Sequence, residues 1–183
     1  MFGTGARLFH WSIALLVVIQ IPAGVAMTSE PLAAYADPLF VLHKGLGVVL
    51  LVLVLARVAW RASHPPPPFP DHMPEHEQRI AHATHIAIYG LLVVMVVSGY
   101  VRTVGDDYPI ELMDVLGIPT LLPLMPDVAA AMLVVHQFAV YGLVILVTAH
   151  VASVVQHHWM QGRPVLQRMW PPVRPKEDDG RDG

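Results

Sequence analysis

The chain has 183 residues, of which 55% are hydrophobic and only 14% are charged, and its mean hydropathy is +0.54. Soluble domains carry roughly a quarter of charged residues, so this composition excludes an ordinary soluble protein and indicates a membrane protein. The net charge of −3 gives no reason to expect nucleic-acid binding. Cysteine is absent, which excludes disulfides, iron–sulfur clusters and thioether-attached haem, whereas histidine is frequent, with 11 residues.

Four apolar stretches are long enough to cross a bilayer, at about 8–27, 39–59, 80–101 and 128–156. The first has no obvious small-residue cleavage site, so we interpret it as a retained helix rather than a signal peptide. The sequence therefore predicts an all-α membrane protein built as a bundle of four transmembrane helices.

Two shorter segments complete the predicted organisation. The apolar section 116–125 is interrupted by proline and glycine, and predicts a short surface-lying piece rather than a fifth crossing. We expect residues 1–171 to form one transmembrane domain. The polar segment 172–183 ends in glycine and charged residues, so we expect a disordered tail.

Basic residues predict the orientation. Nine of the eleven Lys and Arg residues lie at the amino terminus, in the second connection or in the tail, counted with the adjoining helix ends. The two remaining connections hold only Lys44 and Arg102, together with seven Asp and Glu residues. The positive-inside rule therefore places both termini in the cytoplasm.

The fourth span carries two histidines that fall on one helical face. His136 and His150 are fourteen residues apart. In a helix this spacing rotates the side chain by about 40° less than four full turns and advances it by about 21 Å along the axis. In the predicted topology His43 lies at the outer depth of His136, and His10 lies at the inner depth of His150. Facing histidines of antiparallel helices can hold an iron porphyrin, so the pattern predicts two b-type haems with these four axial ligands.

Other interpretations of these histidines stay open. Single intramembrane histidines are often plain core or interfacial residues, but four matched in depth are less easily explained in that way. A non-haem metal site is disfavoured because no Asp, Glu or Cys joins the histidines within the spans. A proton relay is a further alternative, although it does not need two depth-matched pairs.

The third span begins with two more histidines one turn apart. His85 is an alternative partner for His150, in place of His10. A role for His82 and His85 near haem propionates or a quinone is another possibility, and solvation at the interface is a third. Arg57, slightly inside the second span, either binds a haem propionate in a bidentate manner or extends to the membrane surface.

The remaining histidines cluster on the predicted cytoplasmic side. His157 and His158 follow the fourth span, and His72 and His76 lie in the proline-rich second connection. The cluster is either a solvated interface or a quinone headgroup site, where an imidazole donates to a quinone carbonyl and passes protons. His157 is the favoured candidate, because it follows His150 by two helical turns on nearly the same face.

Several short motifs carry a family resemblance. They are Arg7-Leu8-Phe9-His10-Trp11, Leu42-His43-Lys44-Gly45 with Arg57 downstream, His82-Ala83-Thr84-His85 with Tyr89, the His136 and His150 pair, and His157-His158-Trp159 followed by Val165-Leu166-Gln167-Arg168-Met169. Together they span about residues 7–171. In these features the chain resembles the bacterial cytochrome b561 family of four-helix di-haem proteins, which is related to the cytochrome b subunits of nickel–iron hydrogenases and formate dehydrogenases.

The resemblance implies a multi-pass protein of the bacterial inner membrane, surrounded by lipid, that binds two haem b groups. It assigns His10 with His150 to the cytoplasmic haem and His43 with His136 to the periplasmic haem. It also implies electron exchange with ubiquinone near the cytoplasmic haem, and in some members oxidation of periplasmic superoxide.

Two functional hypotheses follow from this resemblance. The first is a superoxide:ubiquinone oxidoreductase, and the alternative is a non-enzymatic electron-transfer anchor for a periplasmic c-type cytochrome, dehydrogenase or hydrogenase partner. A basic outer surface would help to gather superoxide, but the outer connections here are acidic. Lys44, expected beside the outer haem, is the remaining local candidate for an outer substrate site.

Overall fold

The structure is a computed structural model that describes residues 2–69, 73–163 and 165–170. Within these ranges four helices are long and apolar enough to cross a membrane. They are α1 (Thr4–Ala26), α2 (Ala36–Ser63), α3 (Glu75–Gly105) and α5 (Pro126–Val155). The prediction of four transmembrane helices is confirmed. The predicted tail 172–183 and His72 lie outside the described residues.

The helices are longer than the apolar stretches that predicted them. α3, for example, begins at Glu75 and ends at Gly105, whereas hydropathy placed the span at about 80–101. The physical reason is that hydropathy detects the part of a helix that matches the bilayer core. Backbone hydrogen bonding continues beyond that part into polar turns, which the interface can solvate.

Short elements connect the spans. A 3-10 helix, η1 (Glu30–Tyr35), precedes α2, and the short helix α4 (Glu111–Val115) lies between α3 and α5. α5 continues into a π-helical turn, η2 (Gln156–Met160), and a 3-10 turn, η3 (Leu166–Arg168), follows. The predicted surface piece at 116–125 is not helical; the helix lies before it, and Gly117 with φ of +66° follows its end.

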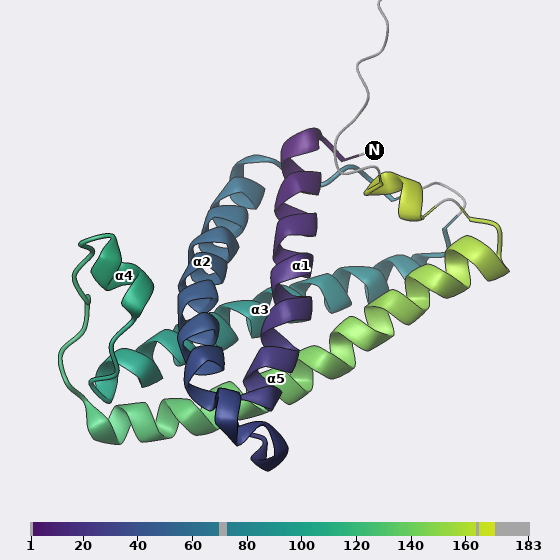
Figure 1. The fold of residues 1–183 in the computed structure, drawn as a ribbon. Coiled ribbons are helices and arrows are strands. Elements are labelled where there is room, and N and C mark those ends of the chain that lie inside the picture. The colour runs from purple at the N-terminus through teal and green to yellow at the C-terminus, as the bar shows by residue number, and fades with distance from the viewer. Residues whose placement is uncertain (1, 70–72, 164, 171–183) are drawn as a thin grey trace, which may run out of the picture.

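The four spans are arranged as two layers. Figure 1 shows α1 beside α2 in one layer, with α3 and α5 crossing behind them. α3 packs most extensively on α5, and α1 on α2, while α2 joins the layers through α3. By contrast, α1 and α2 do not pack closely against α5 over their described lengths. The bundle therefore leaves the approaches between α1 and α5, and between α2 and α5, less tightly closed.

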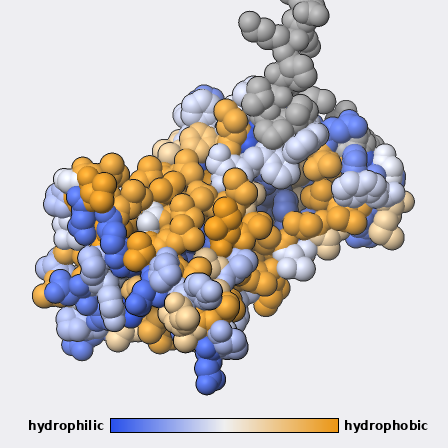
Figure 2. Space-filling view, viewed as in Figure 1, coloured by the Kyte–Doolittle hydropathy of each residue, from blue (hydrophilic) through white to orange (hydrophobic). Residues whose placement is uncertain are grey.

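A small apolar core holds the layers together. Leu50 and Val54 of α2, Leu92 of α3 and Leu143 of α5 are buried at its centre. Outside this core, long apolar side chains cover the surface, and Figure 2 shows a broad hydrophobic band between more polar ends. A bilayer would cover this band, because spanning helices satisfy their backbone polar groups internally and present apolar side chains to lipid.

The predicted cytoplasmic end of the bundle is tied together by the segment after η2. The Nε1 of Trp11 donates to the carbonyl oxygen of Met169 at 3.0 Å, and the rings of Trp11 and Trp170 are 5.4 Å apart. Arg168 donates to the carbonyl oxygen of Pro68 in the proline-rich connector at 2.8 Å. Residues 168–170, Pro68 of the connector and α1 are thereby held at one face of the bundle.

Candidate functional site

The outer histidines predicted to form a pair do lie together. The ring centres of His43 on α2 and His136 on α5 are 6.3 Å apart. Each ring also lies against a glycine of a neighbouring helix. A Cβ atom added at Gly24 of α1 would stand 3.1 Å from Cε1 of His43, and one at Gly99 of α3 would stand 3.0 Å from Cε1 of His136. The two glycines therefore provide the space that the imidazoles occupy.

Hydrogen bonding fixes the protonation pattern of the His136 ring. Its Nδ1 lies 2.8 Å from the carbonyl oxygen of Met95. A carbonyl oxygen only accepts, so Nδ1 must carry the hydrogen, and in the neutral ring Nε2 is left with a lone pair. This is the tautomer that a metal ligand bound through Nε2 requires, with the other nitrogen held by a neighbouring acceptor.

The spacing of the outer pair suits a haem iron. With a metal–nitrogen bond of about 2 Å, and a ring nitrogen about 1 Å from its ring centre, two imidazoles on opposite sides of one iron have centres about 6 Å apart. The 6.3 Å between His43 and His136 agrees with that separation. The two residues also come from α2 and α5, which do not pack closely along their described lengths. The donor set therefore fits a haem held edge-on between these two helices.

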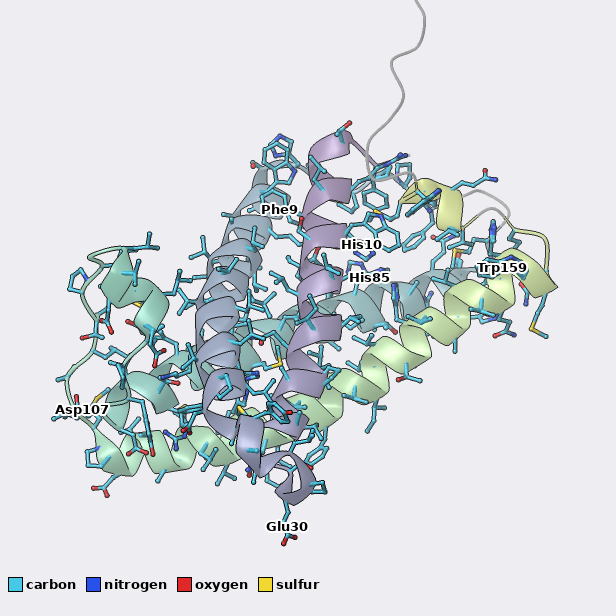
Figure 3. The ribbon with its side chains drawn as sticks, in the orientation of Figure 1. Phe9, His10, Glu30, His85, Asp107 and Trp159 are labelled. Carbon is cyan, nitrogen blue, oxygen red and sulfur yellow. The ribbon has the colours of Figure 1, made fainter. Side chains whose placement is uncertain are left out.

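Three histidines meet at the inner end of the bundle. The ring centres of His85 and His150 are 5.3 Å apart, and His10 lies within electrostatic range of both. Figure 3 shows His10 of α1 and His85 of α3 near one another. The Nδ1 of His85 donates to the carbonyl oxygen of Ala81 at 2.6 Å. The structure thus brings the predicted partner His10 and the alternative partner His85 to the same place.

Helix packing separates these two candidates. His85 and His150 belong to α3 and α5, the most closely packed helices, and their rings are closer than two axial ligands of one iron would be. His10 belongs to α1, which does not pack closely on α5 within the part of the chain that the structure describes. His10 is therefore the candidate whose helix is not packed closely on α5 along its described length.

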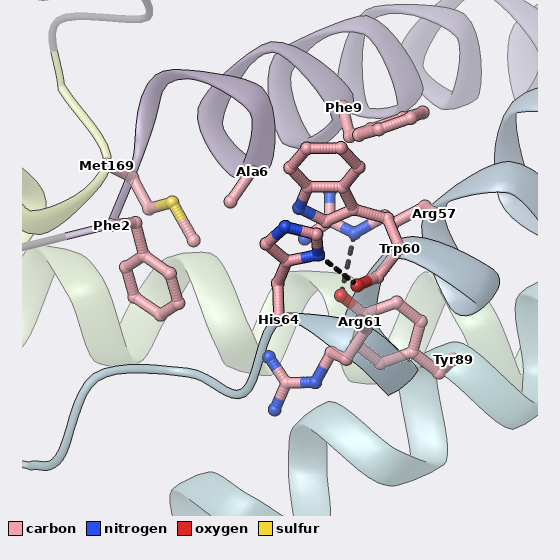
Figure 4. A pocket seen from close by; sticks show the side chains of 9 residues that line it. All are labelled: Phe2, Ala6, Phe9, Arg57, Trp60, Arg61, His64, Tyr89 and Met169. Carbon is pink, nitrogen blue, oxygen red and sulfur yellow. Dashed lines mark hydrogen bonds between the residues drawn. The ribbon is translucent and has the colours of Figure 1, made fainter.

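Arg57 points into a small cavity beside the inner histidines. Its Nε donates to the hydroxyl oxygen of Tyr89 at 2.6 Å, and both residues line a cavity of about 30 Å³, shown in Figure 4. Arg61 and His64 line it as well, and the His64 ring stacks on Trp60 with centres 3.9 Å apart. Arg57 is within electrostatic range of His10. Its guanidinium therefore lies near the inner group rather than extending away to the surface.

The helical spacing used to place His157 does not hold. α5 is α-helical only to Val155, and the next five residues form a π-helical turn, which changes the angle between successive side chains. The placement of His157 on the face of His150 therefore rests on an α-helical geometry that ends at Val155. His157 is half-buried, and its Nδ1 lies 2.9 Å from Oε1 of Gln161. The π-turn could not be foreseen, because no local sequence signal distinguishes it from an α-helical end.

The other histidines of the predicted cytoplasmic cluster differ in how far they are buried. His158 is half-buried, with its ring centre 4.8 Å from that of Trp159. His76 and His82 are exposed on α3. The part of this cluster that includes His72 lies outside the described residues.

Lys44 is engaged in the fold rather than open to the outer surface. Its Nζ lies 2.8 Å from Oε1 of Glu111 and donates to the carbonyl oxygen of Pro109 at 2.6 Å, and its side chain is only 4% exposed. This hydrogen bond from Lys44 holds the pKa of Glu111 below its ordinary value. The other outer-side cation, Arg102, is paired with Asp106 at 3.1 Å.

The expectation of an outer substrate site at Lys44 is therefore corrected. The sequence places Lys44 next to His43 but does not show that a carboxylate from a distant loop folds over it. The ion pair instead fastens α4 to α2 at the outer end of the bundle.

Comparison with known proteins gives the family. A family model described as prokaryotic cytochrome b561 matches residues 1–172. This chain belongs to the prokaryotic cytochrome b561 family. It is also 30% identical over 176 residues to cytochrome b561 homolog 2 of Escherichia coli (strain K12), an alignment that covers 92% of this chain and 90% of the relative. The expected resemblance is confirmed over nearly the whole sequence.

Family membership and the four spans together define the class of protein. The chain is a multi-pass electron-transfer protein of the bacterial inner membrane, and cytochrome b561 membership implies haem b as its cofactor.

Sequence reasoning missed the residues that support the outer pair. Gly24 and Gly99 make room for the rings, and the carbonyl oxygen of Met95 orients His136. Backbone acceptors and helix contacts of this kind leave no trace in a sequence. Gln20 did leave one, because it is an amide in the middle of an otherwise apolar first span.

Proposed function

We propose that this cytochrome b561 holds two b-type haems, one between His43 and His136 and one between His10 and His150. In this function it carries electrons across the inner membrane between a periplasmic donor and the ubiquinone pool. The observation that carries the proposal is the 6.3 Å separation of the His43 and His136 rings between two helices that do not pack closely. Haem b supplies reversible one-electron transfer when it is bound.

The continuous helix α5 supports two sites at different depths. His136 and His150 lie in one uninterrupted α-helix, which separates them by about 21 Å along its axis. The buried residues between the two depths, among them Leu92 and Leu143, are apolar. They exclude water from the middle of the bundle, which keeps the bound groups in a low-dielectric environment.

The inner site has cations suited to haem carboxylates. The Nε of Arg57 donates to Tyr89. Its two terminal nitrogens have no hydrogen bond to another described residue. Neither Arg57 nor Arg61 is within ion-pair distance of an acidic side chain among the described residues. In this proposal Arg57 binds a propionate of the inner haem through its guanidinium, whose fork geometry matches a carboxylate.

Two donors are compatible with this function, namely superoxide and a basic periplasmic redox protein such as a c-type cytochrome. Both outer-side cations, Lys44 and Arg102, are paired with carboxylates. The outer connections are acidic, and this charge repels an anion and attracts a basic protein. These charges favour the protein donor.

Electrons leave at the cytoplasmic end in this proposal, to ubiquinone bound close to His157. The ring is half-buried in the π-helical turn, with its Nδ1 2.9 Å from Oε1 of Gln161, and its Nε2 donates to a quinone carbonyl when the ring is an imidazolium. π-Helical turns occur frequently at functional sites. His72, the second candidate for this role, lies outside the described residues.

The haem assignment is tested on the purified protein. The haem content of the wild type is expected to be two per chain, with two steps in a potentiometric titration. His43→Ala and His136→Ala are each expected to lose the same haem and to keep the other. His10→Ala is expected to lose the second haem, whereas His85→Ala keeps both. Loss of the second haem from His85→Ala, with retention in His10→Ala, would assign the inner ligand to α3 instead.

The donor is tested by stopped-flow spectroscopy of the oxidised protein. Mixing with a reduced basic c-type cytochrome is expected to reduce the haems in a reaction that slows as salt screens the charges. Mixing with superoxide is the competing experiment, and rapid reduction by superoxide alone would establish the oxidoreductase hypothesis in place of the carrier.

A further inference from the structure

Both outer histidines turn the same edge toward a neighbouring helix. A Cβ atom at Gly99 would lie 3.2 Å from Nδ1 of His136 and 4.0 Å from its Nε2. At Gly24 the corresponding distances to Nδ1 and Nε2 of His43 are 3.5 and 3.9 Å. In both rings Cε1 is the atom nearest to the glycine, and Nδ1 is the nearer of the two nitrogens. In both rings Nε2 is the nitrogen turned away from the glycine.

On α3 the acceptor for this edge lies one turn before the glycine. Met95 is four residues before Gly99, and its carbonyl oxygen accepts the hydrogen bond from Nδ1 of His136 at 2.8 Å. On α1 the residue four before Gly24 is Gln20. Residues four apart lie on the same face of a helix, so Gln20 stands toward His43 as Met95 stands toward His136.

The Gln20 side chain already reaches His43. The residue is only 4% exposed, and its Nε2 donates to the carbonyl oxygen of His43 at 2.9 Å. Because a carbonyl oxygen accepts only, this contact fixes which end of the amide is the NH₂ group. The other end, Oε1, is buried and has no hydrogen-bond partner among the described residues, and the same is true of Nδ1 of His43.

We propose that Gln20 is a positioning residue for the outer haem, whose Oε1 accepts the Nδ1 hydrogen of His43 in the haem-loaded protein. The proposal rests on the proposed ligation of a haem by His43. It satisfies two complementary buried groups at once, each of which is costly to leave unpaired. It also leaves Nε2 of His43 as the metal-binding nitrogen, as the Met95 carbonyl does for His136. Acceptors of this kind orient a ligating imidazole and raise its basicity.

The test is a potentiometric titration of purified haem-loaded variants. Gln20→Leu removes the acceptor, so His43 becomes a weaker electron donor and the reduced haem is favoured. We expect the equilibrium constant for reduction of the outer haem to rise by about fivefold, which corresponds to one hydrogen bond. At 59 mV per tenfold change, this raises the midpoint potential by about 40 mV. The inner haem is expected to be unchanged. Gln137→Leu is the matched control, because Gln137 is an exposed amide next to His136 in the sequence.

A second variant separates the hydrogen bond from packing. Gln20→Glu keeps an acceptor oxygen at nearly the same place, so the potential of the outer haem is expected to stay at or below the wild-type value. A rise in Gln20→Glu equal to that in Gln20→Leu would overturn the proposal, as would an unchanged potential in Gln20→Leu. If Gln20→Leu does not fold, a potential of the outer haem in Gln20→Glu above the wild-type value overturns the proposal by itself.

The failure of this inference can be told apart from failure of the proposed function. If His43→Ala retains both haems, the ligand assignment is wrong and the proposal about Gln20 falls with it. If His43→Ala loses one haem, and the Gln20 variants leave the potential of that same haem at the wild-type value, only the role of Gln20 is wrong.

Discussion

Gly99 offers the sharpest test of how the outer site is built. A Cβ atom at this position would lie 3.0 Å from Cε1 and 3.2 Å from Nδ1 of His136, which is closer than ordinary van der Waals contact. The ring has little freedom to withdraw, because Nδ1 is bonded to the carbonyl oxygen of Met95 and Nε2 is expected to be bonded to iron. Gly99→Ala is therefore expected to displace the imidazole by a few tenths of an ångström or to lose the outer haem.

Gly90 gives the matched control on the same helix. A Cβ atom there would meet nothing within 4 Å, so Gly90→Ala reports only the gain in helix propensity, about 1 kcal/mol. Gly99→Ala makes the same gain but adds overpacking, which typically costs about 1–3 kcal/mol. Gly99→Ala should therefore be less stable than Gly90→Ala by about 1–3 kcal/mol.

Haem content per chain and thermal unfolding in detergent measure this difference. The expected result is that Gly90→Ala keeps two haems and is at least as stable as the wild type, whereas Gly99→Ala melts earlier and retains less of the outer haem. Equal haem content and equal stability in the two variants would refute the reasoning that Gly99 is required for close approach of His136.

Three further predictions concern the polar contacts at the two ends. Because the pKa of Glu111 is lowered in the folded protein, its stabilisation is present above the unfolded pKa and is lost as the pH falls through the folded value. The protection of residues 109–118 against hydrogen exchange, measured relative to the intrinsic rate at each pH, should therefore fall at acidic pH in the wild type, and Glu111→Gln should remove most of this dependence at a cost of about 1 kcal/mol or less. Arg57→Gln should lower the reduction equilibrium of the inner haem by about tenfold, because a nearby positive charge is lost, while Arg79→Gln, an exposed control, leaves it unchanged. Trp11→Phe removes the donor to Met169 and should speed proteolysis after residue 160 by about fivefold, and an unchanged rate would show that this hydrogen bond does not hold the segment.

The histidines show how far a sequence can locate a site. The fourteen-residue spacing of His136 and His150 depends only on helical geometry, and the structure does place both in one continuous helix. The depth of His43 follows from the order of the spans, and its ring lies 6.3 Å from that of His136. The inner partner of His150 is harder to predict from the sequence, because His10 and His85 have the same expected depth. They differ only in how their helices pack against α5.

Lys44 and His157 show where sequence reasoning stops. The sequence predicts an outer substrate site at Lys44, but Glu111 and Pro109 bind its amine in the structure. These partners come from a loop whose path depends on how α3 and α5 are joined, which no local pattern records. His157 was placed by continuing an α-helix through a turn that is π-helical.

The sequence by itself determined the membrane class and the number of spans, and it predicts their orientation and the depth of each histidine. These properties follow from hydrophobic length, from the placement of basic residues and from the rise per residue of a helix, all of which are local. Only the tertiary structure decided which helices pack closely and which do not. It also decided that glycines on α1 and α3 receive the outer imidazoles, and that Gln20 reaches His43. Such contacts join residues far apart in the chain, because they depend on how whole helices cross.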